Sequence, residues 1–372
     1  MSLQQWLTER AEEREGAGLV RQLRPRGPEQ DLLDLAGNDY LGLSTDPRVT
    51  DAAAVAAHTW GAGSGASRLV TGTLELHTEL EGALAEFCGR PAALTFSTGY
   101  HANLGVVTAL CDADTLIVSD AHVHASLVDG CRLSKSRVEV VPHNDVDAVA
   151  DALVRRQERR AVILVESIYS VLGDAAPLPE LAAICGLTDA NLIVDEAHAL
   201  GVAGLGGRGL VHAAGLAENP RVIVSATLSK ALGSQGGAVL AQPDVISHLV
   251  NRARPFIYDT GLAPPATGAA LAALRVLESE PERAERARAC ATAFADAVGV
   301  PTPAGAVLSV PMPGPQDALA AQAACADAGL RVGCFRPPSV PDQVSRLRIT
   351  ASARWTDDQV ASAARALAAV VG

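Results

Sequence analysis

Val222-Ile223-Val224-Ser225-Ala226-Thr227-Leu228-Ser229-Lys230 joins an apolar run to one of the only two lysines in this 372-residue chain; the other is Lys135. Further upstream, Leu192-Ile193-Val194 leads in the same way into Asp195. Such branched apolar runs are typical of buried strands, so an amine and a carboxylate are expected at the ends of neighbouring strands. This pair suits pyridoxal phosphate (PLP), because the amine can form an imine and the carboxylate can keep the ring nitrogen protonated. A composition poor in lysine explains the scarcity but not the position of Lys230.

The wider pattern predicts an α/β fold with a mainly parallel, seven-stranded sheet. Continuously apolar strands separated by helical stretches are typical of a parallel sheet that is covered on both faces. The strands are expected at 92–97, 115–119, 138–141, 161–166, 192–195, 222–225 and 237–240. Polar residues follow several of them, at 98–100, 120–124, 166–167, 195–198 and 227–230. Ligands bind at the carboxyl ends of strands in such sheets, so the site is expected there.

Helix signals fill the intervals between these strands. A cap at Asn144 or Asp145 predicts a helix with Val149 and Leu153 on its buried face, and Pro179 suits the first turn of the next helix. After residue 243 a long helical stretch, 264–278, leads to a second α/β unit with strands near 307–310, 331–333 and 347–350. We therefore expect a large cofactor-binding domain (46–243) and a small C-terminal domain (244–372). The N-terminal segment (1–45) is expected to pack near the small domain and the mouth of the site.

Composition limits the function classes. A net charge of −12 argues against general affinity for nucleic acid or anionic membranes, because both require a basic face. The seven cysteines form no CxxC pair, which indicates buried thiols in a reducing cytosol rather than disulfides or zinc ligands. His122 and His124 lack further ligands at zinc-like spacing, so no metal site is expected. Without a secretion signal or a membrane-length apolar run, the protein is expected to be soluble and cytoplasmic.

Asp195-Glu196-Ala197-His198 also spells the DEAH box of nucleic-acid helicases. A helicase additionally requires a phosphate loop in which Gly-Lys is followed by Ser or Thr. Ser134 precedes Lys135 and Ala231 follows Lys230, so neither lysine can belong to such a loop. The helicase interpretation is therefore disfavoured.

Several motifs together resemble the α-oxoamine synthases, which are fold-type-I PLP enzymes. The motifs are Asn38-Asp39-Tyr40-Leu41-Gly42-Leu43, Gly63-Ser64-Gly65-Ala66-Ser67-Arg68-Leu69-Val70-Thr71-Gly72, Asp195-Glu196-Ala197-His198 and Thr227-Leu228-Ser229-Lys230. The resemblance runs from about residue 19 to about residue 368. It implies condensation of an amino acid with an acyl thioester. The segments 119–127 and 336–341 are most similar to the member that joins L-alanine to a pimeloyl thioester, carried by coenzyme A or by a carrier protein.

The resemblance also implies roles for individual residues around the cofactor. Lys230 resembles the lysine that forms the imine, and Asp195 resembles the partner of the ring nitrogen. His198 and Ser170 resemble the groups on the side of the phenolate oxygen. His124 is similar to the histidine that stacks on the ring and contacts the substrate. Lys230, His124 and Asp195 are thus the expected catalytic residues.

Further residues are implied to bind the phosphate. Gly99 and Tyr100 are similar to residues whose backbone faces the phosphate, and Thr227 resembles a residue that contributes a hydroxyl. Thr260 resembles a residue that reaches the phosphate of the other subunit, so the resemblance implies a homodimer with a shared active site.

The implied substrate contacts come from both ends of the chain. Arg348 resembles the arginine that binds the amino-acid carboxylate, whereas Arg21 and Ser339 resemble contacts near the acyl chain. One departure from the family pattern is Leu172, which stands where an acidic residue is common. Alternatives that share the early chemistry are a glycine- or serine-using member of the family and a fold-type-I aminotransferase.

Overall fold

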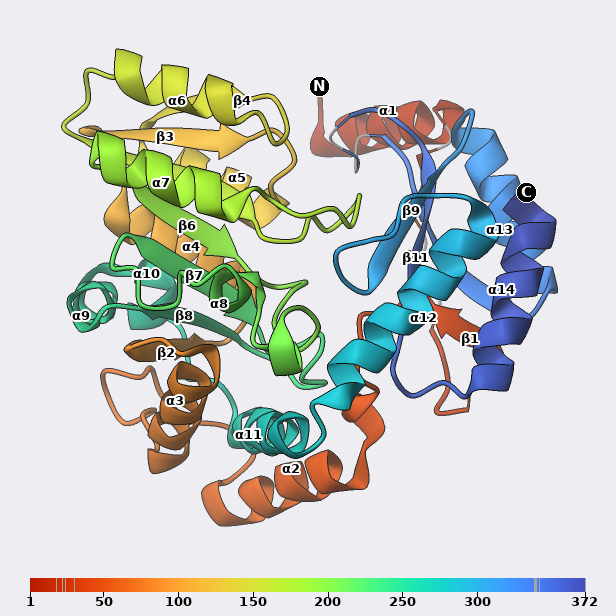
Figure 1. The fold of residues 1–372 in the computed structure, drawn as a ribbon, viewed down its shortest axis with the longest axis horizontal. Helices are drawn as coiled ribbons and strands as arrows, with labels where there is room; N and C mark the ends of the chain where they lie inside the picture. Colours follow the sequence, from red (N-terminus) through yellow and green to blue (C-terminus); the bar gives the residue numbers. More distant parts are fainter. Residues whose placement is uncertain are drawn as a thin grey trace.

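A computed structural model describes residues 1–17, 19–21, 23, 25–29, 31–337, 340 and 342–371. Two α/β units lie side by side, one around each of two sheets (Figure 1). The larger sheet has seven strands in the order β2-β8-β7-β6-β5-β3-β4. These strands are β2 (Ala92–Phe96), β3 (Thr115–Asp120), β4 (Arg137–Val141), β5 (Arg160–Glu166), β6 (Asn191–Asp195), β7 (Val222–Thr227) and β8 (Gly237–Ala241).

The larger sheet is mainly parallel, because β8 alone runs against its neighbours. Successive residues of a strand face opposite sides, and the core reflects this: Leu116 and Val118 join one apolar cluster and Ile117 joins the other. Residues of α6 and α7 lie in the first cluster, and residues of α4, α5, α9 and α10 lie in the second. The helices around this sheet are α3 (Glu75–Cys88), α4 (Gly99–Leu110), α5 (Ala125–Ser134), α6 (Val146–Arg155), α7 (Leu178–Thr188), α8 (Leu210–Ala213), α9 (Pro243–Arg252) and α10 (Arg254–Ile257).

The smaller sheet combines the two ends of the chain. Its order is β1-β10-β11-β9, in which β1 pairs in parallel with β10 and the other pairs are antiparallel. The strands are β1 (Leu33–Leu35), β9 (Val307–Pro311), β10 (Leu330–Phe335) and β11 (Arg346–Thr350). Helices of this unit are α12 (Glu282–Val298), α13 (Pro315–Asp327) and α14 (Asp357–Val371). The first helix, α1 (Leu3–Gly16), buries no residue and begins with a capping box between Ser2 and Gln5.

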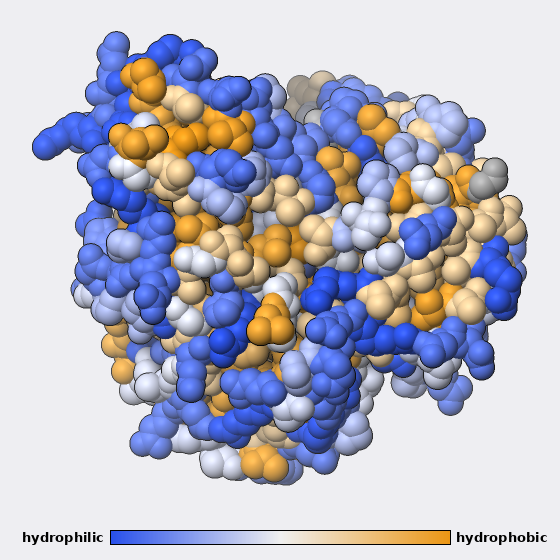
Figure 2. Space-filling view, viewed as in Figure 1, coloured by the Kyte–Doolittle hydropathy of each residue, from blue (hydrophilic) through white to orange (hydrophobic). Residues whose placement is uncertain are grey.

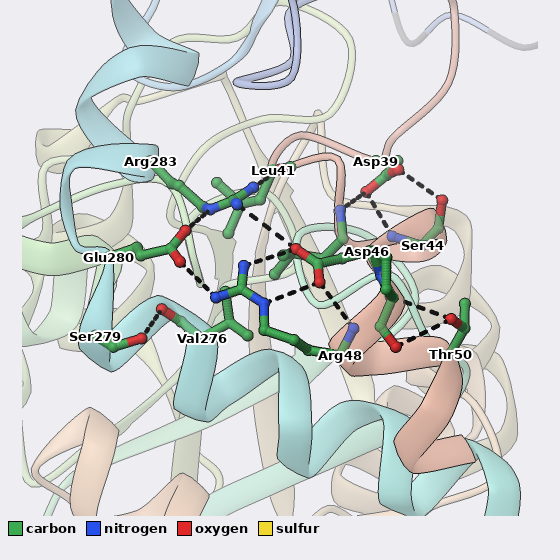
Figure 3. A network of polar contacts seen from close by, with 12 residues as sticks. Asp39, Leu41, Ser44, Asp46, Arg48, Thr50, Val276, Ser279, Glu280 and Arg283 are labelled. Atoms are coloured by element: carbon green, nitrogen blue, oxygen red, sulfur yellow. Dashed lines mark hydrogen bonds and ion pairs between the residues drawn. The ribbon is translucent and has the colours of Figure 1, made fainter. Parts of the chain in front are cut away.

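Two helices and a polar network connect the units. Helix α2 (Pro47–Trp60) packs along α11 (Pro264–Ser279), which leads into α12. At this junction Arg48 donates to Asp46 and Glu280, and Arg283 donates to Glu280 and to the carbonyl of Leu41. Figure 3 shows Asp46 between the two arginines. These hydrogen bonds therefore link the segment before α2 to the turn between α11 and α12. The short 3₁₀ turns are η1 (Leu43–Thr45) and η2 (Leu205–Gly207).

The predicted fold class is confirmed, and each predicted strand lies within two residues of an observed one. Asp145 caps α6 by accepting from the backbone of Ala148, and Pro179 lies in the first turn of α7. Strand β1 was not predicted. The domain boundaries stay a prediction; β1 does join the smaller sheet, while α9, α10 and α11 contact elements of the larger unit.

The surface is mixed in polarity. Hydrophilic residues follow much of the outline of the face shown in Figure 2, and apolar residues lie in smaller groups between them. Among the described residues, no helix combines the length and apolar character that a membrane span requires. The seven cysteines are free thiols, and six of them are buried.

Candidate active site

A cavity of about 250 Å³ lies at the carboxyl ends of β5, β6 and β7, beside the first turns of α4 and α5. Seven of the predicted site residues line it: Gly99, Tyr100, His124, Asp195, His198, Thr227 and Lys230. The other lining residues are Thr98, Asn103, Ser126, Glu166, Ala197, Ala226 and Ser229. The structure therefore brings these seven predicted residues together around one cavity at the strand ends.

Lys230 follows β7, and its Nζ lies 2.9 Å from Nε2 of His198. Burial lowers the pKa of Lys230 to about 8, because desolvation disfavours the ammonium. The charges of Asp195 and Glu166 oppose this shift, whereas that of Arg348 adds to it. An amine with such a pKa can be deprotonated near neutral pH, which suits both a nucleophile and a base.

Asp195 ends β6 in the strand next to β7 and is almost fully buried. Its Oδ2 accepts from Nδ2 of Asn103 at 2.7 Å, and its Oδ1 accepts from the backbone of Ala197 at 2.9 Å. These donors hold the carboxylate in one orientation at the cavity wall. A cationic ring nitrogen is the kind of partner that such a buried carboxylate requires.

Asn103 links Asp195 to His124 through a network that sequence reasoning missed. Its Nδ2 also donates to Oγ of Ser126 at 2.8 Å, and Ser126 lies 2.7 Å from Nδ1 of His124. Oδ1 of Asn103 accepts from Ser225 at 2.6 Å. The available signal was a single amide within the otherwise apolar residues 102–107 of α4. His124 itself lies at the N-cap of α5 rather than on a strand, and burial lowers its pKa.

The first turn of α4 also faces the cavity, through Thr98, Gly99 and Tyr100. Thr98 accepts from the backbone of His101 and Ala102, which leaves the amides of Gly99 and Tyr100 without a partner inside the helix. A Cβ on Gly99 would lie 2.9 Å from Cβ of Thr227, so only glycine allows this close approach. A helix N-terminus with free amides and a neighbouring hydroxyl suits a phosphate.

Glu166 is a further buried carboxylate that faces the cavity. Its Oε2 accepts from the backbone of Ser170 at 3.0 Å, while its Oε1 has no hydrogen-bond partner among the described residues. Burial and the charge of Asp195 raise the pKa of Glu166 to about 8, and Lys230 opposes that shift. The sequence indicated Glu166 only as a polar residue at a strand end.

Arg348 lies on β11, outside the residues that line the cavity. Its Nε donates to the carbonyl of Ser170 at 2.7 Å, and both terminal nitrogens lie 3.3 Å from Oδ1 of Asn38. The side chain is buried and forms no ion pair with a carboxylate of the described chain. Within the described chain, no carboxylate therefore neutralises its positive charge. Ser170 contributes backbone contacts and does not line the cavity.

The remaining predicted residues lie elsewhere. Thr260 is exposed and forms a bridge with Ser67, so it does not line the cavity of its own chain. Arg21 is also exposed and outside the cavity lining. Ser339 lies outside the described residues. Leu172 is half-buried in the turn between β5 and α7.

The residues present fit PLP. The cavity is lined by an amine, a buried carboxylate on the adjacent strand and a helix N-terminus suited to a phosphate. Glu166, whose Oε1 has no hydrogen-bond partner among the described residues, also lines it. Together with the mainly parallel sheet, they define a fold-type-I PLP-dependent transferase.

Comparisons with known proteins agree. Residues 30–367 match the family "aminotransferase class I and II". The chain is 56% identical to 8-amino-7-oxononanoate synthase of Mycolicibacterium gilvum (strain PYR-GCK), over 98% of this chain and 97% of the relative. It is 54% identical to the enzyme of that name from Mycobacterium marinum (strain ATCC BAA-535 / M), over 98% of this chain and 94% of the relative. The chain belongs to the class I and II aminotransferases and, within them, to the 8-amino-7-oxononanoate synthases.

Solved structures show the same fold. Sphingomonas wittichii serine palmitoyltransferase aligns with a TM-score of 0.92 at 29% identity, covering 100% of this chain and 98% of that one. An SPT structure with a PLP internal aldimine also aligns at 0.92, with 30% identity and the same coverage. 8-Amino-7-oxononanoate synthase from Francisella tularensis aligns at 0.77 with 27% identity, covering 91% of this chain and 97% of that one.

Proposed function

We propose that this protein condenses L-alanine with a pimeloyl thioester in biotin biosynthesis. A bond forms between Cα of alanine and the acyl carbon while the thiol leaves, and the bond from Cα to the carboxylate breaks to release carbon dioxide. The product is 8-amino-7-oxononanoate. Full-length relatives of that name at 54–56% identity support the substrates. The observation that carries the chemistry is the pair of Lys230 and Asp195 in one cavity.

PLP is the cofactor, and when bound it withdraws electrons from Cα of the amino acid. We assign its covalent attachment to Lys230 and its ring nitrogen to the carboxylate of Asp195. His124 would lie against the ring. The amides of Gly99 and Tyr100 would hold its phosphate.

The chain itself supplies three further functions. Arg348 binds the carboxylate of alanine, since a guanidinium can grip it with two parallel hydrogen bonds. Lys230 removes the proton from Cα, because its low pKa leaves much of the amine unprotonated near pH 8. His124 orients the acyl carbonyl. Its imidazole is itself positioned by the hydrogen bonds that lead through Ser126 and Asn103 to Asp195.

We further propose a homodimer in which Thr260 contacts the phosphate of the other subunit. Around Thr260, the side chains of Leu69, Val70 and Tyr258 are 52%, 75% and 71% exposed in the single chain. Burial of such apolar residues favours association. Val70→Arg should convert the dimer to monomers in sedimentation; an unchanged dimer would contradict this surface. The free thiols favour a cytoplasmic location.

A second candidate is a serine-using member of the same fold. The TM-score to serine palmitoyltransferase, 0.92, is higher than the TM-score to 8-amino-7-oxononanoate synthase from Francisella tularensis, 0.77, and this favours the serine-using candidate. The names of the sequence relatives favour alanine instead. The test is to supply alanine, glycine or serine with pimeloyl-CoA, pimeloyl-carrier protein or palmitoyl-CoA, and to identify products by mass spectrometry. We expect 8-amino-7-oxononanoate from alanine alone. A keto acid without thiol release would instead indicate an aminotransferase.

A further inference from the structure

The imidazole of His143, just after β4, lies between two carboxylates. Its Nδ1 is 3.0 Å from Oδ1 of Asp120, at the end of β3. Its Nε2 is 2.8 Å from Oδ2 of Asp174, in the turn between β5 and α7. His143 is half-buried and does not line the active-site cavity. It therefore joins the larger sheet to the turn that contains Ser170.

The contacts around His143 fix the charge of its imidazole. Both oxygens of Asp120 accept from backbone amides, Oδ1 from His122 at 2.7 Å and Oδ2 from Asn144 at 2.8 Å. Asp120 is thus an ionised acceptor, and Nδ1 of His143 must donate to it. Oδ2 of Asp174 accepts from the side chain of Asn144 at 3.1 Å, so Nε2 of His143 donates to a carboxylate as well. An imidazole that donates through both nitrogens is a cation.

The other groups around His143 leave this charge in place. Burial lowers the pKa of His143, but the hydrogen bonds and charges of the two carboxylates outweigh it and raise the pKa to about 9. His122 stacks on the imidazole at 4.0 Å, and burial together with the charge of His143 lowers its own pKa, so it stays neutral. The titratable groups near this cluster are Asp120, Asp174, His122, Tyr169 and, beyond His122, Asp342.

The turn between β5 and α7 contacts His143 at two places that flank Ser170. Asp174 binds the imidazole through its carboxylate, and the ring of Tyr169 meets it edge-on, with centroids 4.3 Å apart. The backbone of Tyr169 donates to the carbonyl of Asp174 at 2.9 Å, which closes the turn. The carbonyl of Ser170, the next residue, accepts from Nε of Arg348 at 2.7 Å. The orientation of this guanidinium therefore depends on a turn that His143 holds.

We propose that His143 is a positioning residue for the amino-acid carboxylate: as a cation between Asp120 and Asp174, it holds the turn whose Ser170 carbonyl orients Arg348. This rests on the role that the proposed function gives Arg348. A neutral imidazole has one proton for two carboxylates. Asp120 keeps its two amide donors, so the contact that opens is the one with Asp174.

The sign of the pH dependence follows from the raised pKa of His143. The contribution of the cation is complete below its ordinary pKa of 6.5 and is lost as pH rises through about 9. If the protonated imidazole tightens alanine binding, bound alanine must in turn raise the pKa of His143 by the same free energy. This reciprocity can be measured without turnover.

The first experiment is an NMR titration of the PLP-loaded protein with and without saturating alanine, in which His143→Gln identifies the signal of His143. We expect alanine to raise the pKa of His143 by about 0.7, which corresponds to a roughly five-fold effect on alanine affinity. His248, exposed on α9, should titrate alike in both samples. A pKa of His143 that alanine leaves unchanged would overturn the proposal, because an ion pair with a purely structural role would behave in that way.

The second experiment is an alanine titration of two variants near pH 7, followed through the absorbance of the cofactor. His143→Gln removes the charge, and Asp174→Ala removes its partner in the turn, a side chain that is 42% exposed. Both should load with PLP normally and bind alanine at least about five-fold more weakly. Asp112→Ala, which removes an exposed, ion-paired aspartate just before β3, is the matched control and should bind alanine like the parent. Alanine affinity equal to the parent's in Asp174→Ala would contradict the proposal even if His143→Gln failed to fold.

Failure of this proposal can be told apart from failure of the proposed function. If Arg348→Lys weakens alanine binding and Asp174→Ala does not, the carboxylate site stands and the role of His143 is wrong. If neither variant changes alanine binding, the assignment of Arg348 fails, and the role of His143 fails with it. The reaction itself is tested separately, by the product analysis.

Discussion

Replacing Arg348 by lysine tests the proposed carboxylate site most directly. In the structure its guanidinium uses Nε for the Ser170 carbonyl at 2.7 Å and leaves two terminal nitrogens near Asn38, both at 3.3 Å. A lysine retains the charge but offers a point charge in place of the planar pair of donors. Loss of one charge-assisted hydrogen bond costs about 2 kcal/mol, which corresponds to roughly 30-fold weaker alanine binding.

The assay is a titration of alanine into PLP-loaded protein, followed through the absorbance of the cofactor. Arg346→Lys is the matched control, because Arg346 is equally buried on β11 but pairs with Asp342 at 2.6 Å. We expect Arg348→Lys to load with PLP normally and to bind alanine weakly, and the control to bind alanine like the parent protein. Equal alanine affinity in Arg348→Lys and the parent would refute the assignment.

Four further predictions concern charged residues of the site and the core. Lys230→Ala should lose turnover and the lysine adduct that borohydride reduces; a reduced adduct on Lys135, which lies exposed at the end of α5, would contradict this in peptide mass spectrometry. Asp195→Asn should still bind PLP in equilibrium dialysis but turn over slowly, because a neutral amide no longer stabilises a protonated ring nitrogen; full turnover would exclude that role. Glu166→Gln removes a charge that raises the pKa of Lys230, so the rising limb of the pH–rate profile should move to lower pH, and a shift upward would be inconsistent. Burial raises the pKa of Glu196 to about 7, above its unfolded value of about 4.5, so its contribution to stability is lost as pH rises between these values. The melting temperature of Glu196→Gln minus that of the parent protein should therefore increase between pH 5 and pH 8. A difference that does not change with pH would argue against a buried charge.

The larger sheet was predictable because most of its strands are continuous apolar runs that end in polar residues. Strand β4 is an exception, since Glu139 interrupts it. Lys230 and Asp195 could be placed together on that basis alone. Strand β1 could not, since Leu33, Asp34 and Leu35 form a strand only through their pairing with β10. Three residues with one buried side chain carry too weak a pattern to stand out.

The site was less predictable where contacts depend on packing between distant elements. Asn103 reaches Asp195 because α4 packs against β7 and β8, and nothing in the local sequence specifies that distance. The contact between Tyr40 and His198 likewise joins the N-terminal segment to the turn after β6. Thr260, predicted from resemblance, does not line the cavity of its own chain, so its role stays a prediction about the dimer.

The pairing of Leu33 with Leu330 bears on how the chain is made. During synthesis the first forty residues leave the ribosome long before β10 exists, so β1 must wait without its partner until nearly the whole polypeptide has emerged. Closing so long a loop is entropically costly and slow compared with local folding. Arg348 follows β10 in the sequence, whereas Asn38 and Tyr40 follow β1. The proposed carboxylate site is therefore assembled at the end of translation, and a nascent chain stalled before β11 would hold all seven strands of the larger sheet but no Arg348.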